Sequence, residues 1–261
     1  MADPAPLLCA RDIGFGYDRQ PVLAGINLTV NAGELVCILG PNGCGKTTLL
    51  KILLGALQPQ QGEVMVQGRP LTQLSARVRG QTLSYVPQDT DVAFTYPVHA
   101  LVAMARWPWR PDTWWSDWGM LQTQDEAIIT EALQQTHLDT LARRSFQTLS
   151  GGEQQRVLWA RAVAQTTPVM LLDEPVSNMD PKQQVHLLDG LQHWVRAGGA
   201  ACLVCHDLNI AANWGTRVIF MQAGRIILDA PPAVALCEAP IAATYGVKPT
   251  FSGITFTTEE S

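Results

Sequence analysis

The sequence predicts an α/β fold in which helices cover both faces of a mainly parallel sheet. Three observations predict it. Residues 7–88 are dominated by short apolar segments separated by turn residues, and residues 97–165 carry apolar side chains at a helical spacing of three to four. From residue 169 onwards apolar strands return, and a segment with helical spacing lies between the first two of them. Strands that alternate with helices favour parallel pairing.

Each expected element rests on a local pattern. In the first third, apolar segments between turns predict strands over residues 7–13, 26–30, 34–40, 63–68 and 82–88. Apolar spacing without a β-branched run predicts helices over residues 98–106, 123–138 and 151–165. In the last third of the chain, the apolar patterns predict a helix over residues 181–197 and strands over residues 169–174, 201–206 and 217–222.

The composition is that of a globular protein without a nucleic-acid surface. Of the 261 residues, 47% are hydrophobic, which is enough for a sizeable core. The net charge of −5 comes from 18 basic and 23 acidic side chains spread along the chain, so no basic stripe is expected. Six cysteines are too few and too irregular for a disulfide framework, which favours a reducing compartment. No signal-peptide pattern and no run near ~20 apolar residues is present, so we expect a cytosolic protein that can dock on a membrane partner.

The stretch "GPNGCGKTT" follows a predicted strand and opens a predicted helix, which is the context of a phosphate-binding loop. Its glycines let backbone N–H groups converge on a phosphate at the helix N-terminus. Lys46 is predicted to reach the β- and γ-phosphates of a nucleotide, and the Thr47 hydroxyl to ligate Mg²⁺. The alternative is an ordinary glycine-rich turn. The residues assigned to this loop are Gly40, Pro41, Asn42, Gly43, Cys44, Gly45, Lys46, Thr47 and Thr48.

Cys44 has two open interpretations within this loop. A helix N-terminus lowers the pKa of a nearby thiol, which would make Cys44 reactive and open to redox control. The other interpretation is a small side chain that the loop tolerates.

The run "VMLLDEP" ends an apolar strand with two acidic residues. Parallel sheets bind ligands at the carboxyl ends of their strands, so Asp173 and Glu174 are expected at the same edge as the loop. Asp173 is expected to hold Mg²⁺ through water, and Glu174 to accept a proton from the water that attacks the γ-phosphate. Taken alone, the pair is equally consistent with a solvated turn.

The stretch "LSGGEQQR" opens a long predicted helix. Ser150 and Glu153 are spaced as a capping box, so an ordinary helix cap is one interpretation. A cap needs one glycine at most, however, and Gly151 with Gly152 would leave the first turn bare for a second phosphate. One chain would then carry two half-sites for phosphate.

Together these motifs resemble the ATP-binding subunit of an ABC transporter, over roughly residues 7–230. "GPNGCGKTT" matches the Walker A loop, "LSGGEQQR" the ABC signature, and "VMLLDEP" the Walker B strand with its glutamate. The resemblance implies one domain over residues 1–261: a P-loop NTPase core with a mainly parallel sheet, an N-terminal antiparallel β-subdomain, an inserted helical subdomain at about 89–165 and a C-terminal extension at about 231–261. It also implies ATP and Mg²⁺ as cofactors.

The resemblance assigns further residues to the site. Gln88 in "VPQD" occupies the Q-loop position and is expected to act in catalysis and at the metal. Tyr17 in "GFGY" stands where the family stacks an aromatic ring on adenine; the alternative is a tyrosine in the core of a strand. "SNMD" resembles the D-loop, with Asn178 and Met179 where small and leucine residues are more usual, and with Asp180 in place.

The stretch "CLVCH" matches the pattern that attaches c-type haem. Attachment would need both thiols at one haem edge, but strand residues three apart point to opposite faces. We therefore interpret Cys202 and Cys205 as packing residues. The resemblance makes His206 the switch histidine, which contacts the γ-phosphate and acts in catalysis.

The interval between the Q-loop and the signature indicates a class of transporter. "YPVHALVAMARWPW" resembles the corresponding segment of importers of iron-siderophore complexes, haem and vitamin B12, and the ending "ATYGVKP" resembles that group too. Arg106, Pro108 and Trp109 fit the pattern, whereas Ala105 replaces a glycine and Ala100 an acid. The alternative is a soluble ABC ATPase coupled to cluster assembly or repair.

The resemblance also implies partners. Two copies of the chain would pair head to tail, so that Ser150 to Gly152 of one chain face the P-loop of the other across ATP. Two integral membrane permease subunits, with a substrate-binding protein acting through them, would complete an importer, and the chain would sit peripherally on the cytoplasmic face of the inner membrane. The tryptophan-rich residues 107–118 would form either a local minicore or a surface for the permease.

Overall fold

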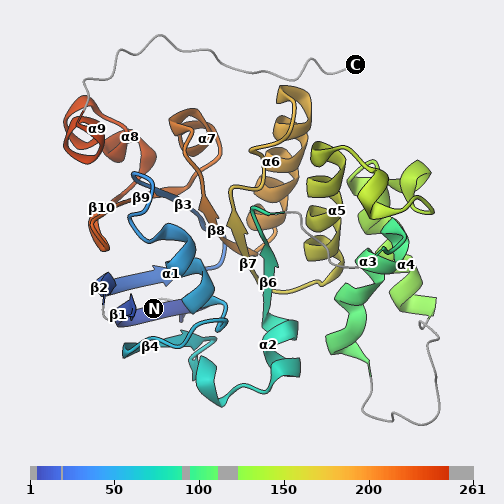
Figure 1. Ribbon diagram of the computed structural model, residues 1–261, viewed down its shortest axis with the longest axis horizontal. Coiled ribbons are helices and arrows are strands. Elements are labelled where there is room, and N and C mark those ends of the chain that lie inside the picture. Colours follow the sequence, from blue (N-terminus) through green and yellow to red (C-terminus); the bar gives the residue numbers. More distant parts are fainter. Residues whose placement is uncertain (1–4, 19, 90–94, 111–122, 247–261) are drawn as a thin grey trace.

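The chain folds into two sheets and a group of helices at one end (Figure 1). The computed structural model describes residues 5–18, 20–89, 95–110 and 123–246. Its strands are β1 (Leu8–Tyr17), β2 (Gln20–Val30), β3 (Leu35–Leu39), β4 (Gln61–Val66), β5 (Arg69–Pro70), β6 (Leu83–Val86), β7 (Val169–Asp173), β8 (Ala200–Val204), β9 (Arg217–Gln222) and β10 (Arg225–Ala230). Its α-helices are α1 (Lys46–Leu53), α2 (Ala76–Thr82), α3 (Val98–Ala103), α4 (Thr123–Gln135), α5 (Gly151–Ala164), α6 (Pro181–Arg196), α7 (Leu208–Asn213), α8 (Pro232–Ala235) and α9 (Glu238–Tyr245).

The larger sheet has the strand order β10-β9-β3-β8-β7-β6. Neighbouring strands from β9 to β6 are parallel, and β10 adds an antiparallel edge. The smaller sheet, in the order β2-β1-β4-β5, is antiparallel. The α/β fold with a mainly parallel sheet and an N-terminal antiparallel part, as expected from the sequence, is therefore confirmed.

The larger sheet separates two hydrophobic cores. Along β8 the alternate residues Ala200, Cys202 and Val204 pack with α1 and the smaller sheet, whereas Ala201 and Leu203 pack with α5 and α6. This follows from the two-residue period of a strand. Because both faces are buried, β3, β7 and β8 consist almost entirely of apolar residues, which is why they were recognisable in the sequence.

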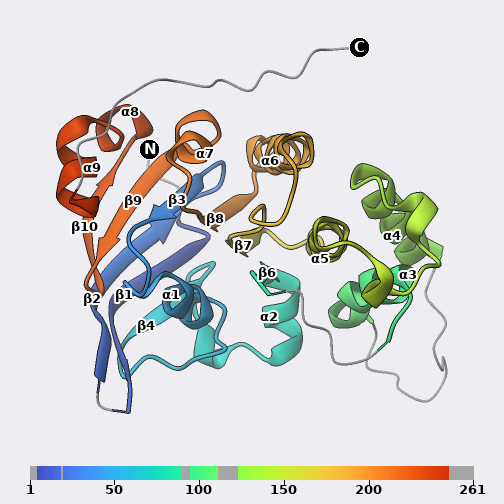
Figure 2. The ribbon, with the colours of Figure 1, turned by 45° about the horizontal axis from the view of Figure 1, so that its top comes forward.

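The helices α3, α4 and α5 contact one another at the end of the molecule that lies away from β1, β2 and β4 (Figures 1 and 2). The helix predicted over residues 98–106 ends at Ala103 and continues as a 3₁₀ helix over Met104–Trp109, which contains Pro108. Helix α5 contacts α3 and α4 as well as β6, so it lies between those two helices and the larger sheet.

Several elements escaped the sequence analysis. Helix α2 has no fully buried residue and therefore lacks the apolar period that would reveal it. Strand β10 alternates exposed and partly buried side chains and follows β9 after a two-residue turn. Helices α7, α8 and α9 are short, so their patterns are too brief to read.

Within the part of the chain that the structure describes, no helix is long and apolar enough to cross a membrane.

Candidate active site

The predicted phosphate-binding loop joins the end of β3 to the start of α1. Gly40 has φ 151°, and a Cβ there would lie 2.1 Å from the carbonyl oxygen of Met221. Gly45 has φ 104°, and a Cβ there would lie 2.7 Å from Cδ2 of Leu23. Only glycine tolerates both the backbone conformation and the close approach at these positions. The loop is therefore shaped by contacts with β2 and β9, beyond its own sequence.

Lys46 is buried at the start of α1. Its Nζ donates hydrogen bonds to the carbonyl oxygens of Gly40, at 2.8 Å, and Pro41, at 3.0 Å. These bonds keep the ammonium group over the loop, at the end of the helix where backbone N–H groups have no carbonyl partner. A positive charge and free N–H groups at one point form a binding site for an anion such as phosphate.

Asp173 ends β7 and is almost completely buried. Burial raises the pKa of its carboxyl group, and a side-chain hydrogen bond with Thr47 opposes that rise. Its Oδ1 is buried without a hydrogen-bond partner among the described residues. A buried carboxylate oxygen without a partner, beside a hydroxyl group, is a donor set that fits a hard cation such as Mg²⁺.

Three predicted catalytic residues meet at the next position along this edge. Nε2 of Gln88 donates to Oε2 of Glu174 at 3.0 Å, and the His206 ring Nε2 contacts Oε1 of the same carboxylate. The three residues follow β6, β7 and β8, which are neighbours in the sheet and run parallel. Because parallel strands end at the same edge, residues that are far apart in the sequence converge there.

The backbone of Glu174 is itself unusual. Its φ is 48°, in the left-handed region that side chains seldom adopt, and its N–H donates to the carbonyl oxygen of Val204 at 3.0 Å. The chain therefore turns sharply directly after β7 while still bonded to β8. The turn presents the carboxylate to Gln88 and His206, with its side chain only 16% exposed.

The signature residues form a complete capping box at the start of α5. The Ser150 hydroxyl accepts a bond from the Glu153 N–H, and Glu153 accepts one from the Ser150 N–H at 2.8 Å. A Cβ on Gly152 would lie 3.1 Å from the backbone carbonyl oxygen of Asn178, whereas a Cβ on Gly151 would have no neighbour closer than 3.8 Å. Packing within the chain thus explains why position 152 is a glycine, which the sequence analysis missed. Packing does not explain the glycine at position 151.

The two predicted half-sites are separate within one chain. Among the described residues, no hydrogen bond or ion pair joins residues 150–152 to the loop of residues 40–48. Asp180, in the segment that resembles the D-loop, accepts a hydrogen bond from the Gln183 N–H at 2.9 Å as the N-cap of α6. Met179 is buried and fills an apolar site, as a leucine would.

Tyr17 lies at the end of β1 and is 45% exposed, with its ring edge-to-face against Phe15 at 4.9 Å between centroids. The alternative of a core tyrosine is therefore wrong. The residue is on the smaller sheet, whose strand β2 contacts Gly45 through Leu23.

The cysteines of "CLVCH" are buried on opposite sides of the sheet. Cys202 belongs to the core next to α1, and Cys205 to the core next to α5 and α6. Burial raises the pKa of Cys202 to about 12. These positions agree with the interpretation of both thiols as packing residues, and they do not offer a common edge to a haem.

Cys44 is also a packing residue in this structure. Its side chain belongs to the core next to α1, and burial raises the pKa of the thiol although the nearby Lys46 lowers it. Desolvation therefore outweighs the helix N-terminus, and the structure favours the tolerated small side chain over the reactive thiol.

Tyr85 is a site residue that the sequence analysis did not find. Burial raises the pKa of its hydroxyl group, and the nearby Asp173 carboxylate raises this pKa further. Tyr85 pairs with Leu171 in the register of β6 and β7, so it lies on the same face as Asp173, two residues further along β7. The contact was hidden because it depends on the register between strands that are more than 80 residues apart.

Comparison with known proteins agrees with this geometry. The family described as "ABC transporter" matches residues 23–177, which span the loop, the signature and the acidic strand end. The chain belongs to this family. As an ABC transporter ATPase it binds ATP and couples its hydrolysis to transport.

The relatives of this ABC ATPase include hemin import ATP-binding proteins HmuV. The protein of Pseudomonas putida is 38% identical over 231 residues and covers 87% of both chains. That of Pseudomonas aeruginosa is 38% identical over 247 residues and covers 93% of both.

Two solved structures extend the comparison. A metal-chelate type ABC transporter in an inward-facing conformation matches with a TM-score of 0.78 at 27% identity, over 93% of this chain and 90% of the other. The dimeric bacterial ABC transporter cassette MJ0796 matches with a TM-score of 0.76 at 25% identity, over 86% and 98%.

Proposed function

We propose that this ABC ATPase drives the import of haem or a related metal chelate through separate membrane subunits. The observation that carries ATP hydrolysis is the convergence of Gln88 and His206 on Glu174, beside Asp173. The cargo class rests on similarity: the relatives named above import hemin, and one similar structure belongs to a metal-chelate type transporter. Iron-siderophore and cobalamin remain members of the same proposed class.

The proposed mechanism assigns each residue a task on ATP. Lys46 and the N–H groups of the loop bind the β- and γ-phosphates, because they present positive charge at a helix N-terminus. Thr47, Asp173 and Gln88 hold Mg²⁺, which when bound neutralises phosphate charge. Glu174 accepts the proton of the attacking water, and its carboxylate is oriented by the bond from Gln88.

His206 has a separate part in this mechanism. Its Nε2 contacts Glu174 and its side chain is 42% exposed, so part of the ring remains accessible to solvent. We assign the ring edge to the γ-phosphate, where an imidazole N–H stabilises negative charge as it develops. Tyr17, exposed on the smaller sheet, stacks on the adenine.

The complete site needs two chains. Among the described residues, Ser150, Gly151 and Gly152 form no hydrogen bond with the P-loop of their own chain, and Gly151 leaves the first turn of α5 open. We assign this helix N-terminus, with Asp180 beside it, to the γ-phosphate side of an ATP bound to a second copy. This arrangement is supported by the similar cassette MJ0796, which is described as dimeric.

The remaining partners follow from the import function. Two permease subunits cross the membrane, a substrate-binding protein delivers cargo to them, and this chain lies on their cytoplasmic face. The helical subdomain, at about residues 89–165, is assigned to permease contact, since Met104 and Trp107 are exposed there. Trp109 instead donates from Nε1 to the carbonyl oxygen of Gln165 at 2.8 Å. The other tryptophans of the cluster lie outside the described residues.

One experiment tests the function as a whole. The intact transporter is isolated from native membranes by a tag on this chain and reconstituted in vesicles with ATP inside. Hemin, a ferric siderophore and cobalamin are then offered outside, each with its binding protein. ATP-dependent accumulation of one of them is expected. Recovery of the chain with a soluble assembly only, and with no integral membrane protein, would favour the alternative of a non-transport machine.

A further inference from the structure

Two histidines from different helical segments meet at the surface, outside the proposed ATP site. His137 follows the end of α4 and His186 lies on α6, and both side chains are exposed. Their rings are arranged edge to face, with 5.4 Å between the ring centroids. The sequence analysis gave neither residue a role. The pair therefore joins two elements that are distant in the chain and brings together two side chains that bind metal ions.

The backbone at His137 has a conformation that favours another residue. Its φ is 53°, in the left-handed region. The N–H groups of His137 and Leu138 donate to the carbonyl oxygens of Gln134, at 3.0 Å, and Leu133, at 2.8 Å. These two bonds form a Schellman motif, in which the residue at the position of His137 is usually glycine. A histidine there costs backbone strain, and such strain is typical of residues that bind a ligand.

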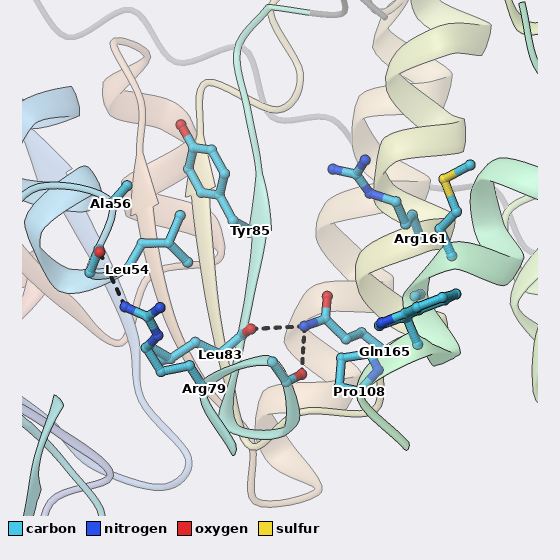
Figure 3. A pocket seen from close by; sticks show the side chains of 13 residues that line it. Leu54, Ala56, Arg79, Leu83, Tyr85, Pro108, Arg161 and Gln165 are labelled. Carbon is cyan, nitrogen blue, oxygen red and sulfur yellow. Dashed lines mark hydrogen bonds between the residues drawn. The ribbon is translucent and has the colours of Figure 1, made fainter. Parts of the chain in front are cut away.

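A small cavity of about 40 Å³ lies beside the pair. Both imidazoles line it, with the amide side chains of Gln135 and Gln183, and none of its described lining residues is acidic. One water molecule needs about 10–15 Å³ of such space, so the cavity can take an ion with its water ligands. A larger cavity of about 480 Å³ beside Tyr85 and Arg161 (Figure 3) has no histidine, cysteine or acid among its described lining residues. Of the two cavities, only the small one offers imidazole groups to a ligand.

The separation of the two rings matches that of two imidazoles bound to one zinc ion. A Zn–N bond is about 2.0–2.1 Å and a ring nitrogen lies about 1.1 Å from its ring centroid, so two imidazoles on a tetrahedral ion have centroids roughly 5.0–5.5 Å apart. Imidazole ligands without carboxylates suit zinc and similar transition metals, whereas Mg²⁺ and Ca²⁺ prefer oxygen. The described part of the chain forms no metal-binding group of three histidine, cysteine or acidic side chains. Water would therefore supply the remaining ligands.

Arg156 also lines the cavity and makes an anion the alternative ligand. Its Nη1 donates to the carbonyl oxygens of Thr136, at 3.4 Å, and His137, at 3.3 Å, and its Nε is buried. Two of its three nitrogens are thus engaged or covered, which leaves little to hold an anion. The charge of Arg156 opposes a cation, but solvent at the exposed histidines weakens that repulsion. The observations therefore favour a metal ion.

We propose that His137 and His186 bind one Zn²⁺ ion, or a similar divalent transition metal ion, through one ring nitrogen of each and with water in the other positions. The inference depends neither on the cargo nor on the head-to-tail dimer.

The position of the site gives the ion a structural consequence. It ties the end of α4 to α6, and both elements hold the first turns of α5. Arg156, one turn after Gly152, bonds to the backbone of His137, and Gln183, one turn before His186, lies beside Gly152. A bound ion therefore restrains the elements around the signature.

Zinc binding is measured on the purified Cys237→Ser chain, since the thiol of Cys237 is exposed and would bind zinc by itself. Isothermal titration should find a Zn²⁺ site whose Kd rises at least about tenfold in His186→Ala, because one of the two protein ligands is lost. His193→Ala, at an exposed histidine of the same helix, is the matched control and should bind zinc as the parent chain does. Equal zinc affinity in these two variants overturns the inference.

His137→Gly separates the loss of a ligand from damage to the fold. Glycine adopts a φ of 53° without strain, so this variant should have a Tm no lower than that of the parent chain without zinc. Zinc should raise the Tm of the parent chain, because it binds the folded state, and should raise that of His137→Gly by less. An equal rise in both chains contradicts the proposal, and misfolding cannot produce that result.

The double variant shows whether the two histidines share one ion. If they do, His137→Gly combined with His186→Ala should weaken zinc binding little more than either change alone, because one lost ligand already disrupts the site. Losses that add up would mean two separate sites and would rule out the shared ion.

The anion alternative is tested with inorganic phosphate in place of zinc. Phosphate should raise the Tm of the parent and Arg156→Gln chains equally, since the proposed site takes no anion. A rise that is lost in Arg156→Gln, together with no effect of zinc on the parent chain, would identify an anion site and overturn the inference.

Discussion

Glu174 accepts a hydrogen bond at 3.0 Å from Gln88, although 86 residues separate the two in the chain. The same carboxylate contacts His206. Its position is therefore defined from both neighbouring strand ends, which is what a residue needs if it is to take a proton from a water molecule in one fixed place.

Glu174→Gln should retain ATP binding and lose nearly all turnover. The amide keeps the size of the side chain and loses the proton acceptor, so we expect kcat to fall about 10²-fold or more. Steady-state phosphate release and equilibrium binding of a fluorescent ATP analogue measure the two effects. Glu63→Gln, at an exposed glutamate of β4, is the control, and near-normal turnover of Glu174→Gln would show that Glu174 is not the base.

Lys46→Ala should weaken nucleotide binding itself. The ammonium group is held at the loop by the carbonyl oxygens of Gly40 and Pro41, so its charge acts on bound phosphate before any reaction. Isothermal titration with ATP should show at least about a tenfold higher Kd. Lys51→Ala, at an exposed position of the same helix, should bind ATP nearly as wild type does, and unchanged affinity of Lys46→Ala would contradict the loop assignment.

His206→Ala should remove most ATPase activity, whereas Cys202→Ala combined with Cys205→Ala should keep it. The thiols are buried in the two cores and the imidazole contacts Glu174. The double cysteine variant should lose about 1–2 kcal/mol of unfolding free energy per site through small cavities. A Soret absorbance in the wild-type protein that disappears with the cysteines would restore the haem interpretation.

Cys44 should resist alkylation near neutral pH. Burial raises the pKa of its thiol, so the reactive thiolate is scarce and forms only as the pH rises. Mass spectrometry after treatment with iodoacetamide should find Cys237, which is exposed, modified first. In a Cys237→Ser chain at pH 7, rapid modification of Cys44 would identify a reactive thiol after all.

The ATPase activity of the purified chain should rise with its concentration. In the proposed head-to-tail dimer the signature of one chain completes the P-loop site of the other, so activity should increase as a higher concentration shifts the monomer to the dimer. Phosphate release per milligram, measured over a wide dilution series, checks this. Specific activity that stays flat would mean that one chain holds the complete site.

Local patterns were sufficient for the parts of the site that are continuous in the sequence. The glycines and Lys46 between β3 and α1, the capping box at Ser150, and the acidic pair after β7 were all predicted, because each depends on a few neighbouring residues. The buried strands were equally clear, since a strand covered on both faces is an unbroken apolar run.

The tertiary structure decided what those parts touch. The order β8-β7-β6 brings His206 and Gln88 to Glu174, and the register of β6 against β7 places Tyr85 with Asp173. An apolar run indicates that a strand is buried. It does not indicate which strand lies beside it or at which residues the two strands pair. Those choices are made by the packing of the whole chain, and so is the burial that raises the pKa of Cys44.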